Sequence, residues 1–412
     1  MSVNYWSGEE FPQYADKLRL FHGFLYSANN GSMDVESFIG SEYGQELGRR
    51  LHHRFDIEDE PLGEAALSYY ESIGLKKEGF ETEDFFTRWY IMTPLEAFTE
   101  EGKGKKYPLL FWHHGGGNPI ESSECVANVC EVAGREKFIV VMAQNTNWKN
   151  VKRILDIVKE KYPVDEERVY CSGFSQGAQQ SHSVFMHMPE TFAGAAVSGV
   201  DLFRPYDNQE VNYTEEELER VRTCVVPVIT FVGACEPSCF VPLNDWSPRR
   251  TPQVDIMHGF PDTRAHLNEL RNQDDDPTRI VSPDGSARMA KGYAPAEGED
   301  RHEWKVNMVN RRLELLGCDT LDVAKCIAFA DHPEDEFHHI MGAYAPEERT
   351  ELHYGYEHYV MDYFDHDGVN VMRYIAVENS PHWPQLIFGD EAWSFLKHFR
   401  RDSSTGKIVF EK

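Results

Sequence analysis

Residues 168–187, RVYCSGFSQGAQQSHSVFMH, decide the fold of this chain. Val169–Cys171 is a short apolar run typical of a buried strand, and Gln176–His187 has the pattern of a helix. Between them, Gly173-Phe174-Ser175-Gln176-Gly177 matches G-x-S-x-G, the signature of a nucleophile elbow. At such a sharp strand-to-helix turn, glycines two residues to either side of the serine avoid steric clashes. The pattern predicts that Ser175 is a nucleophile raised above a sheet; the alternative is a glycine-bracketed turn without chemistry.

Apolar runs and helical patterns continue to alternate on both sides of this stretch. Further strands are expected at Tyr107–Trp112, Phe138–Met142, Ala195–Val200 and Val225–Val232, and helices at Cys125–Val132 and Val151–Lys161. Continuous apolar strands alternating with helices favour a parallel sheet that is covered on both faces. The sequence therefore predicts an α/β fold with a mostly parallel central sheet and helices on both sides of it.

The pattern divides the chain into four segments. Residues 1–75 are expected to form an N-terminal helical extension without a chemical motif, an accessory layer or an oligomer contact. Residues 76–242 form the first part of the α/β core. Residues 243–354 are polar and are expected to be a large insertion, a cap over the site, before the last strands. Residues 355–412 complete the core, with a hairpin signal at Asp365–Gly368 and a final helix over Glu391–Arg400.

A glycine cluster directly follows the first core strand. His113-His114-Gly115-Gly116-Gly117-Asn118 resembles the HGGG loop that supplies half of an oxyanion hole. Backbone N–H donors preorganised at such a loop stabilise the negative charge that develops during acyl transfer. We expect the N–H groups of Gly116 and Gln176 to serve, with Gly117 as the alternative to Gly116. A phosphate-binding loop is disfavoured because no Lys-Ser/Thr pair follows.

The general base and its carboxylate partner are expected late in the chain, since such elbows belong to folds whose triad runs in the order Ser, acid, His. His382 follows the strand that ends at Val377 and precedes the final helix, in which His398 is expected to lie. Glu236 follows the strand that ends at Val232, and Asp245 is its competitor. A carboxylate at this turn orients the imidazole and stabilises its charged form.

Other residues near these motifs carry weaker signals. An acyl or aryl pocket could be lined by Trp112, His114, Phe174 and Trp383, with core packing as the alternative for the aromatic rings. Four clustered histidines fit no ligand spacing and are expected to be solvated: His338, His339, His353 and His358. We expect no metal and no organic cofactor.

The charge balance restricts the partners. Lys and Arg total 41 residues against 69 Asp and Glu, a formal net charge of -28. Such a surface disfavours nucleic acid and anionic membranes, since both bind clustered cations. The first residues lack a basic start and an apolar run, and no stretch of roughly eighteen apolar residues occurs. With eight scattered cysteines expected to be free thiols, the sequence predicts a cytoplasmic protein that acts on a small molecule, with homo-oligomerisation left open.

Together these residues resemble the serine esterases of the α/β-hydrolase type that include polyhydroxybutyrate depolymerases and feruloyl or acetylxylan esterases. The similarity covers roughly residues 80–242 and 355–402. It is carried by the glycine loop, Arg168-Val169-Tyr170, the stretch from Gly233 to Pro242, and His382-x-Pro384 before Trp393. The family more often has Asp where Glu236 stands, and its members are commonly secreted.

The resemblance implies hydrolysis of carboxylic esters through an acyl-enzyme on Ser175, with His382 as base and Glu236 as acid. It does not fix the substrate. Two other readings stay open: a serine peptidase of the prolyl-oligopeptidase type, and a catalytically inactive hydrolase fold that binds a partner.

Overall fold

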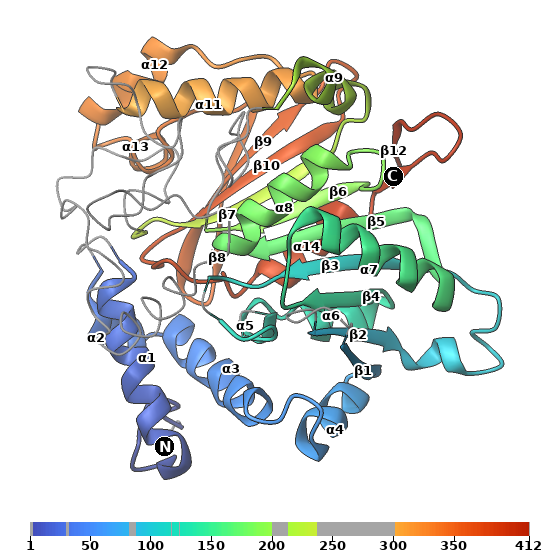
Figure 1. Ribbon diagram of the computed structural model, residues 1–412. Coiled ribbons are helices and arrows are strands. Elements are labelled where there is room, and N and C mark those ends of the chain that lie inside the picture. Colours follow the sequence, from blue (N-terminus) through green and yellow to red (C-terminus); the bar gives the residue numbers. More distant parts are fainter. Residues whose placement is uncertain are drawn as a thin grey trace, which may run out of the picture.

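The computed structural model of the chain describes residues 3–29, 33–81, 88–116, 118–122, 124–199, 213–236 and 301–411. Over these residues a ten-stranded sheet runs in the order β1-β2-β4-β3-β5-β6-β7-β10-β9-β8 (Figure 1). Its strands are β1 (Leu75–Glu81), β2 (Arg88–Pro94), β3 (Tyr107–His113), β4 (Ile139–Ala143), β5 (Val164–Phe174), β6 (Gly194–Ser198), β7 (Val228–Gly233), β8 (Glu347–His353), β9 (Tyr356–Phe364) and β10 (Asn370–Val377).

The centre of the sheet is parallel and its two ends are antiparallel. Strands β4, β3, β5, β6, β7 and β10 pair in parallel. Strands β1 and β2 form an antiparallel hairpin at one end, and β8, β9 and β10 are antiparallel at the other. This confirms the mostly parallel sheet expected from the apolar runs. It also places the carboxyl ends of β3, β5, β7 and β10 along one edge, where the loops that carry the motifs begin.

Helices cover both faces of the sheet, as the sequence predicted. One face is packed by α1 (Ala15–Ser27), α2 (Val35–Gly40), α3 (Glu42–Glu58), α4 (Glu64–Ser72), α5 (Glu124–Ala127), α6 (Val129–Glu136) and α14 (Phe388–Leu396). The other is packed by α7 (Trp148–Lys161), α8 (Gln176–His187), α9 (Glu215–Thr223), α11 (Arg301–Leu316), α12 (Val323–Ala328) and α13 (Glu336–Met341). Alternate strand residues serve the two cores: Leu110 and Trp112 point to the first, Leu109 and Phe111 to the second.

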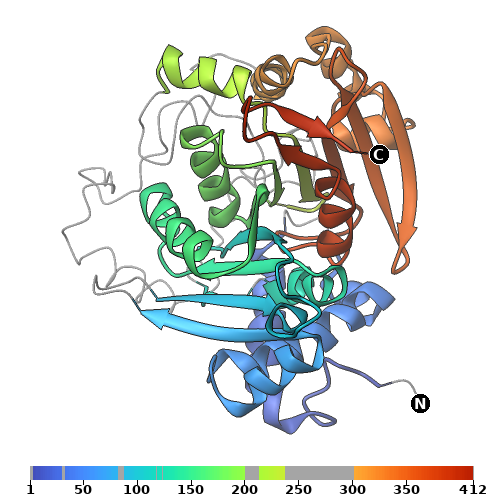
Figure 2. The same ribbon diagram turned by 90° about the vertical axis from the view of Figure 1, so that its right-hand side faces the viewer.

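The N-terminal helices and the helices α11–α13 lie at opposite ends of the molecule. In both views α1–α4 (blue) are at the bottom and α11–α13 (orange) are at the top (Figures 1 and 2). Burying all this apolar surface on two faces is what makes so long a sheet stable. Within the described residues no helix is long and apolar enough to cross a membrane.

The sheet resumes earlier than expected after the insertion. Residues 301–353 were assigned to the insertion, yet α11 packs on the sheet through Val306, Val309 and Leu313, and Glu347–His353 forms the edge strand β8. The polar composition of β8 is that of an edge strand, whose outer side faces water. The rest of the insertion, including the expected cap, lies outside the described residues.

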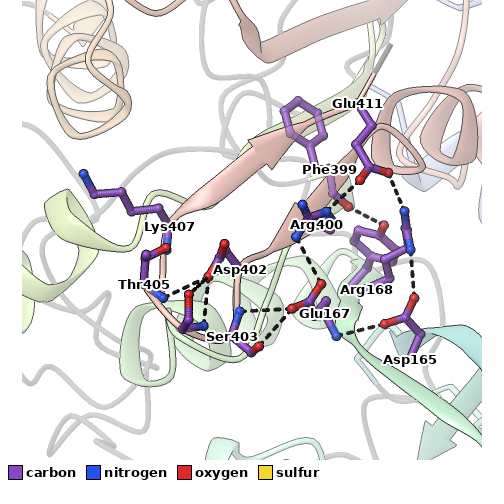
Figure 3. Close-up of polar contacts among 12 residues, drawn as sticks. Asp165, Glu167, Arg168, Phe399, Arg400, Asp402, Ser403, Thr405, Lys407 and Glu411 are labelled. Carbon is purple, nitrogen blue, oxygen red and sulfur yellow. Dashed lines mark hydrogen bonds and ion pairs between the residues drawn. The ribbon is translucent and has the colours of Figure 1, made fainter.

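The C-terminus folds back onto the start of the elbow strand. The expected final helix is α14, which ends at Leu396, and the chain then forms the hairpin β11 (Phe399–Arg401) and β12 (Ile408–Phe410). His398 therefore lies between helix and hairpin, where its Nδ1 contacts the carbonyl of Glu411, and not inside the helix. Figure 3 shows the polar contacts between this C-terminal segment and β5, including that of Arg168 with Glu411, while Arg168 also binds Asp165 within β5.

Candidate active site

Three strand ends bring Ser175, Glu236 and His382 together. Ser175 follows β5 directly, Glu236 lies in the turn after β7, and His382 lies in the loop between β10 and α14. Because β5, β6, β7 and β10 are neighbours in the parallel part of the sheet, their carboxyl ends open onto the same edge. Residues separated by as many as 207 positions therefore meet at one point.

The three side chains form a continuous hydrogen-bonded chain. His382 Nε2 lies 2.9 Å from Ser175 Oγ, and His382 Nδ1 lies 2.7 Å from Glu236 Oε2. With the carboxylate at Nδ1, that nitrogen carries the proton and donates it, so Nε2 is left to accept from the serine hydroxyl. This is the geometry that a nucleophile, its base and an orienting acid require.

Glu236 is placed entirely inside the protein. Its side chain has no exposed surface, and its second oxygen, Oε1, accepts a 2.7 Å hydrogen bond from the N–H of Gly233. Burial raises the pKa of the Glu236 carboxyl above its ordinary value, while His382 and the Gly233 N–H act in the opposite direction. Each carboxylate oxygen thus has its own fixed donor. The competitor Asp245 lies outside the described residues.

The elbow is strained as its sequence predicts. Ser175 has φ 54° and ψ −114°, a conformation that residues with a side chain rarely adopt, and its N–H is tied to the carbonyl of Ser198 at 2.8 Å. A Cβ on Gly177 would lie 2.1 Å from the carbonyl oxygen of His113, and one on Gly173 would lie 2.6 Å from the backbone of Gly177. Both glycines are therefore required for the close approach of β3, β5 and α8.

The glycine loop lies beside the start of α8. A Cβ on Gly116 would be 3.1 Å from the side-chain oxygen of Gln176, the first residue of that helix. The N–H groups in the first turn of a helix have no partner within the helix, so that of Gln176 is available to a ligand. The structure thus brings together the two residues expected to form the oxyanion hole. Gly117 lies outside the described residues.

His114 holds this loop through contacts of both ring nitrogens, and its expected place in a pocket stays a prediction. Its Nδ1 lies 2.7 Å from the carbonyl oxygen of Gly115, and its Nε2 lies 2.9 Å from that of Gln144, in the loop after β4. At its far end the loop is anchored by a buried ion pair, in which Lys77 on β1 reaches Glu121 at 2.9 Å. This pair could not be predicted from the sequence, because a lysine in a polar strand carries no sign of burial.

The three aromatic candidates separate into two groups. Phe174 stacks beside His382, with ring centroids 4.8 Å apart, and lies 5.7 Å from Trp383, so both rings border the triad. Trp112 is fully buried on β3 and packs edge-on against Phe388. It belongs to the core on the α14 face and not to a pocket.

Sequence reasoning missed the contribution of the N-terminal helices to the site. The N–H of His382 donates to the carbonyl of Ala28, at the end of α1, over 2.6 Å. Trp383 packs edge-on against Phe21 and Phe24 of the same helix. The sequence analysis expected only an accessory helical layer here, and no motif in residues 1–75 indicated that it contacts the loop of His382.

The four clustered histidines differ in their surroundings. Over the described residues no group of three or more His, Cys, Asp and Glu side chains is arranged to hold a metal ion. His338 forms ion pairs with the neighbouring carboxylates of Asp335 and Glu348. The expectation that these histidines are solvated is wrong for His358, which is fully buried on β9 and whose pKa burial lowers to about 4. The seven cysteines that the structure describes are all free, and Cys239 lies outside the described residues.

A second buried histidine, His113, makes the stability of the protein depend on pH. Its Nδ1 contacts Ser181 Oγ at 2.8 Å, and burial lowers its pKa to about 3, helped by the nearby His114. The unfolded chain binds this proton near pH 6.5 and the folded protein does not, so the free energy of unfolding falls as the pH drops from about 6.5 toward 3. One such group contributes about 1.4 kcal/mol per pH unit within that window.

We expect His113→Asn, whose amide retains a group for Ser181, to remove this contribution. Urea unfolding at pH 7, 6 and 5 should show a slope that is smaller by about one proton than in the wild type. His366→Asn, at an exposed position in the β9–β10 turn, is the control and should leave the slope unchanged. Equal slopes in His113→Asn and the wild type would contradict the assignment.

Comparisons with solved structures give likenesses of low sequence identity. The fluorophosphonate-binding serine hydrolase FphF of Staphylococcus aureus is 10% identical, over 39% of this chain and 78% of that one, with a TM-score of 0.33. A feruloyl esterase module from Clostridium thermocellum is 16% identical, over 39% and 66%, with a TM-score of 0.31. An acetyl xylan esterase from Aspergillus awamori is 12% identical, over 78% and 99%, with a TM-score of 0.39. Comparisons with protein-family profiles and with curated proteins gave no match.

Likenesses at these TM-scores do not bear on the chemistry of the site. The strand order of the sheet, with Ser175 directly after β5, Glu236 after β7 and His382 after β10, is that of an α/β-hydrolase fold.

Proposed function

We propose that the protein is a serine esterase that hydrolyses small-molecule carboxylic esters through an acyl-enzyme. The observation that carries the proposal is the chain of hydrogen bonds from Ser175 through His382 to Glu236, at 2.9 and 2.7 Å. This arrangement supplies a hydroxyl, an acceptor for its proton and a buried charge that stabilises the protonated acceptor.

In the first step Ser175 Oγ attacks the ester carbonyl carbon while its proton moves to His382 Nε2. The carbonyl oxygen gains a negative charge, which the N–H groups of Gln176 and Gly116 are placed to hold. Collapse of this intermediate expels the alcohol, which takes the proton from His382. Water, which gives its proton to His382, then attacks the carbonyl carbon of the acyl-enzyme. The bond to Ser175 Oγ breaks, the serine takes the proton back from His382, and the carboxylic acid is released. This mechanism needs no metal and no organic cofactor.

The surroundings of the triad favour a substrate with an apolar part. Phe174 and Trp383 border His382, and Trp383 is itself backed by two rings of α1. Both rings are almost fully buried, so they make the surroundings of His382 apolar rather than forming an exposed wall. A neutral ester with an acyl or aryl group suits such surroundings.

A panel of substrates tests the proposal. We expect p-nitrophenyl acetate and butyrate, together with feruloyl and acetyl esters, to be turned over at least tenfold faster than aminoacyl-naphthylamides. A fluorophosphonate probe should label the protein, and peptide mapping should place the label on Ser175. Faster turnover of the amides would instead favour a peptidase, and a folded protein that is neither labelled nor active would favour a binding role.

A further inference from the structure

The N-terminal helices bind the loop that carries His382, in addition to its bonds with the turn after β7 and with β9. We call residues 378–387, between β10 and α14, the histidine loop. The hydroxyl of Tyr43 on α3 accepts from the N–H of Leu386 at 3.1 Å and donates to the side chain of Gln385 at 2.8 Å. The N–H of His382 donates to the carbonyl of Ala28. The histidine loop is therefore bound at His382 and at Leu386 to residues more than 300 positions away in the sequence.

One side chain of α3, that of Arg50, joins this loop to the other side of the site. Arg50 is only 5% exposed. Its Nη1 donates to the carbonyl of Leu386 at 2.9 Å and to the carbonyl of Val126 at 2.6 Å. Val126 lies on α5, the short helix that follows the glycine loop in the chain, and α3 lies alongside α5 (Figure 1). A single nitrogen therefore connects the base-carrying loop with the helix behind the oxyanion loop.

The rest of the guanidinium is also held in place. Nε of Arg50 donates to Glu46 Oε1 at 2.7 Å, one turn back on the same helix. Both hydrogens of Nη1 point to backbone carbonyls, which in a buried position have no water to replace the lost bonds. Arginine keeps its charge when buried and has a rigid fork, so its two bonds set the distance between Val126 and Leu386.

We propose that Arg50 is a positioning residue of the active site: it holds the histidine loop at a fixed separation from α5 and hence His382 in register with the oxyanion loop. The inference rests on the proposed esterase function. It also gives a role to the N-terminal segment, whose sequence carries no chemical motif: this segment acts as the support of the base.

The test compares Arg50→Met with a buried arginine elsewhere. Arg401 is 3% exposed and likewise donates to backbone carbonyls, those of Phe192, Val225 and Gly406. Phe192 and Val225 lie just before the amino ends of β6 and β7, and Gly406 lies in the turn between β11 and β12. The amino ends of β6 and β7 are at the edge of the sheet opposite to Ser175. Arg401→Met therefore removes a similar set of bonds without touching the site. Arg19→Met, at an exposed position of α1 where the side chain pairs with Asp16 and not with Glu46, controls for the loss of a charge.

The readout is kcat per active site, with sites counted by fluorophosphonate labelling so that unfolded protein does not contribute. We expect Arg50→Met to lower kcat by roughly 10- to 100-fold with KM changed less than about threefold, since a displacement of about 1 Å in a catalytic group has effects of this size. Arg401→Met should lower the melting temperature by a similar amount but keep kcat per site within about twofold. Arg19→Met should change neither.

Arg50→Lys adds a conservative variant. The lysine ammonium can donate to both carbonyls, but the side chain is shorter than that of arginine and cannot also retain the bond to Glu46. We therefore expect kcat per site to lie between those of Arg50→Met and the wild type. If Arg50→Met is not recovered folded, a three- to tenfold loss in Arg50→Lys supports the inference. Wild-type kcat per site in Arg50→Met, or in Arg50→Lys when it alone is recovered, would overturn it. An inactive and unlabelled wild type would instead overturn the esterase proposal.

Discussion

Ser175→Ala is expected to lower kcat for p-nitrophenyl esters by roughly 10⁴- to 10⁶-fold, the range found when the nucleophile of a serine triad is removed. The variant keeps the oxyanion donors and the binding surface but has no oxygen to attack the carbonyl carbon. Among the residues that the structure describes, the hydroxyl of Ser175 forms a hydrogen bond with His382 alone. The fold should therefore tolerate its removal. KM should change little.

Two measurements check this expectation. Steady-state hydrolysis of p-nitrophenyl butyrate gives kcat, and labelling by a fluorophosphonate probe should disappear completely in the variant. Ser183→Ala, a buried serine farther along α8, is the matched control and should keep kcat within about twofold. If Ser175→Ala retained more than a tenth of the wild-type rate, the nucleophile would have to be another residue.

The elements of the site that could be predicted from the sequence are those whose signal is local. Ser175 is identified by two glycines and by the strand and helix that flank it, all within 168–187. Glu236 and His382 follow apolar runs that are recognisable as strands by themselves. The order of these runs in the chain, together with the rule that parallel strands present their carboxyl ends at one edge, was enough to expect the three residues at one place.

The parts that could not be predicted depend on contacts made by the backbone or by edge strands. His382 is held by the carbonyl of Ala28, and Arg50 binds the carbonyls of Val126 and Leu386. Every residue has such a carbonyl, so no residue type marks it in the sequence. The strands β1 and β8 were missed because edge strands alternate polar and apolar residues or are largely polar, unlike the central apolar runs.

Burial of single polar residues was the second kind of error. His358 lies in a polar stretch and was expected to be solvated, yet on β9 its side chain is fully buried. The helix expected to reach residue 400 ends at Leu396 because the chain must turn there to place Phe399 in the hairpin with β12. In both cases tertiary packing overrides the local pattern.

Glu236→Gln is expected to lower kcat by roughly 10³- to 10⁴-fold, although the substitution is nearly isosteric. The reason lies in the two donors that face the carboxylate. Oε1 accepts the N–H of Gly233, which can only donate, so the amide oxygen of a glutamine must occupy that position. The amide nitrogen is then directed at His382 Nδ1, 2.7 Å from the present Oε2. An NH₂ group there forces Nδ1 to accept, which moves the imidazole proton to Nε2, where it faces Ser175 and blocks proton transfer.

Glu236→Asp distinguishes this tautomer effect from a simple loss of contact. Aspartate keeps the charge and accepts at both positions but is shorter by one methylene, so the imidazole retains its correct tautomer while the bond to Nδ1 lengthens. We expect a loss of only about 10- to 100-fold in kcat, with KM nearly unchanged in both variants. Asp245→Asn is the third variant and should stay within about threefold of the wild type. The small effect is expected because Glu236 already supplies the carboxylate at His382. A large loss in Asp245→Asn combined with an active Glu236→Gln would instead assign the role of the acid to Asp245.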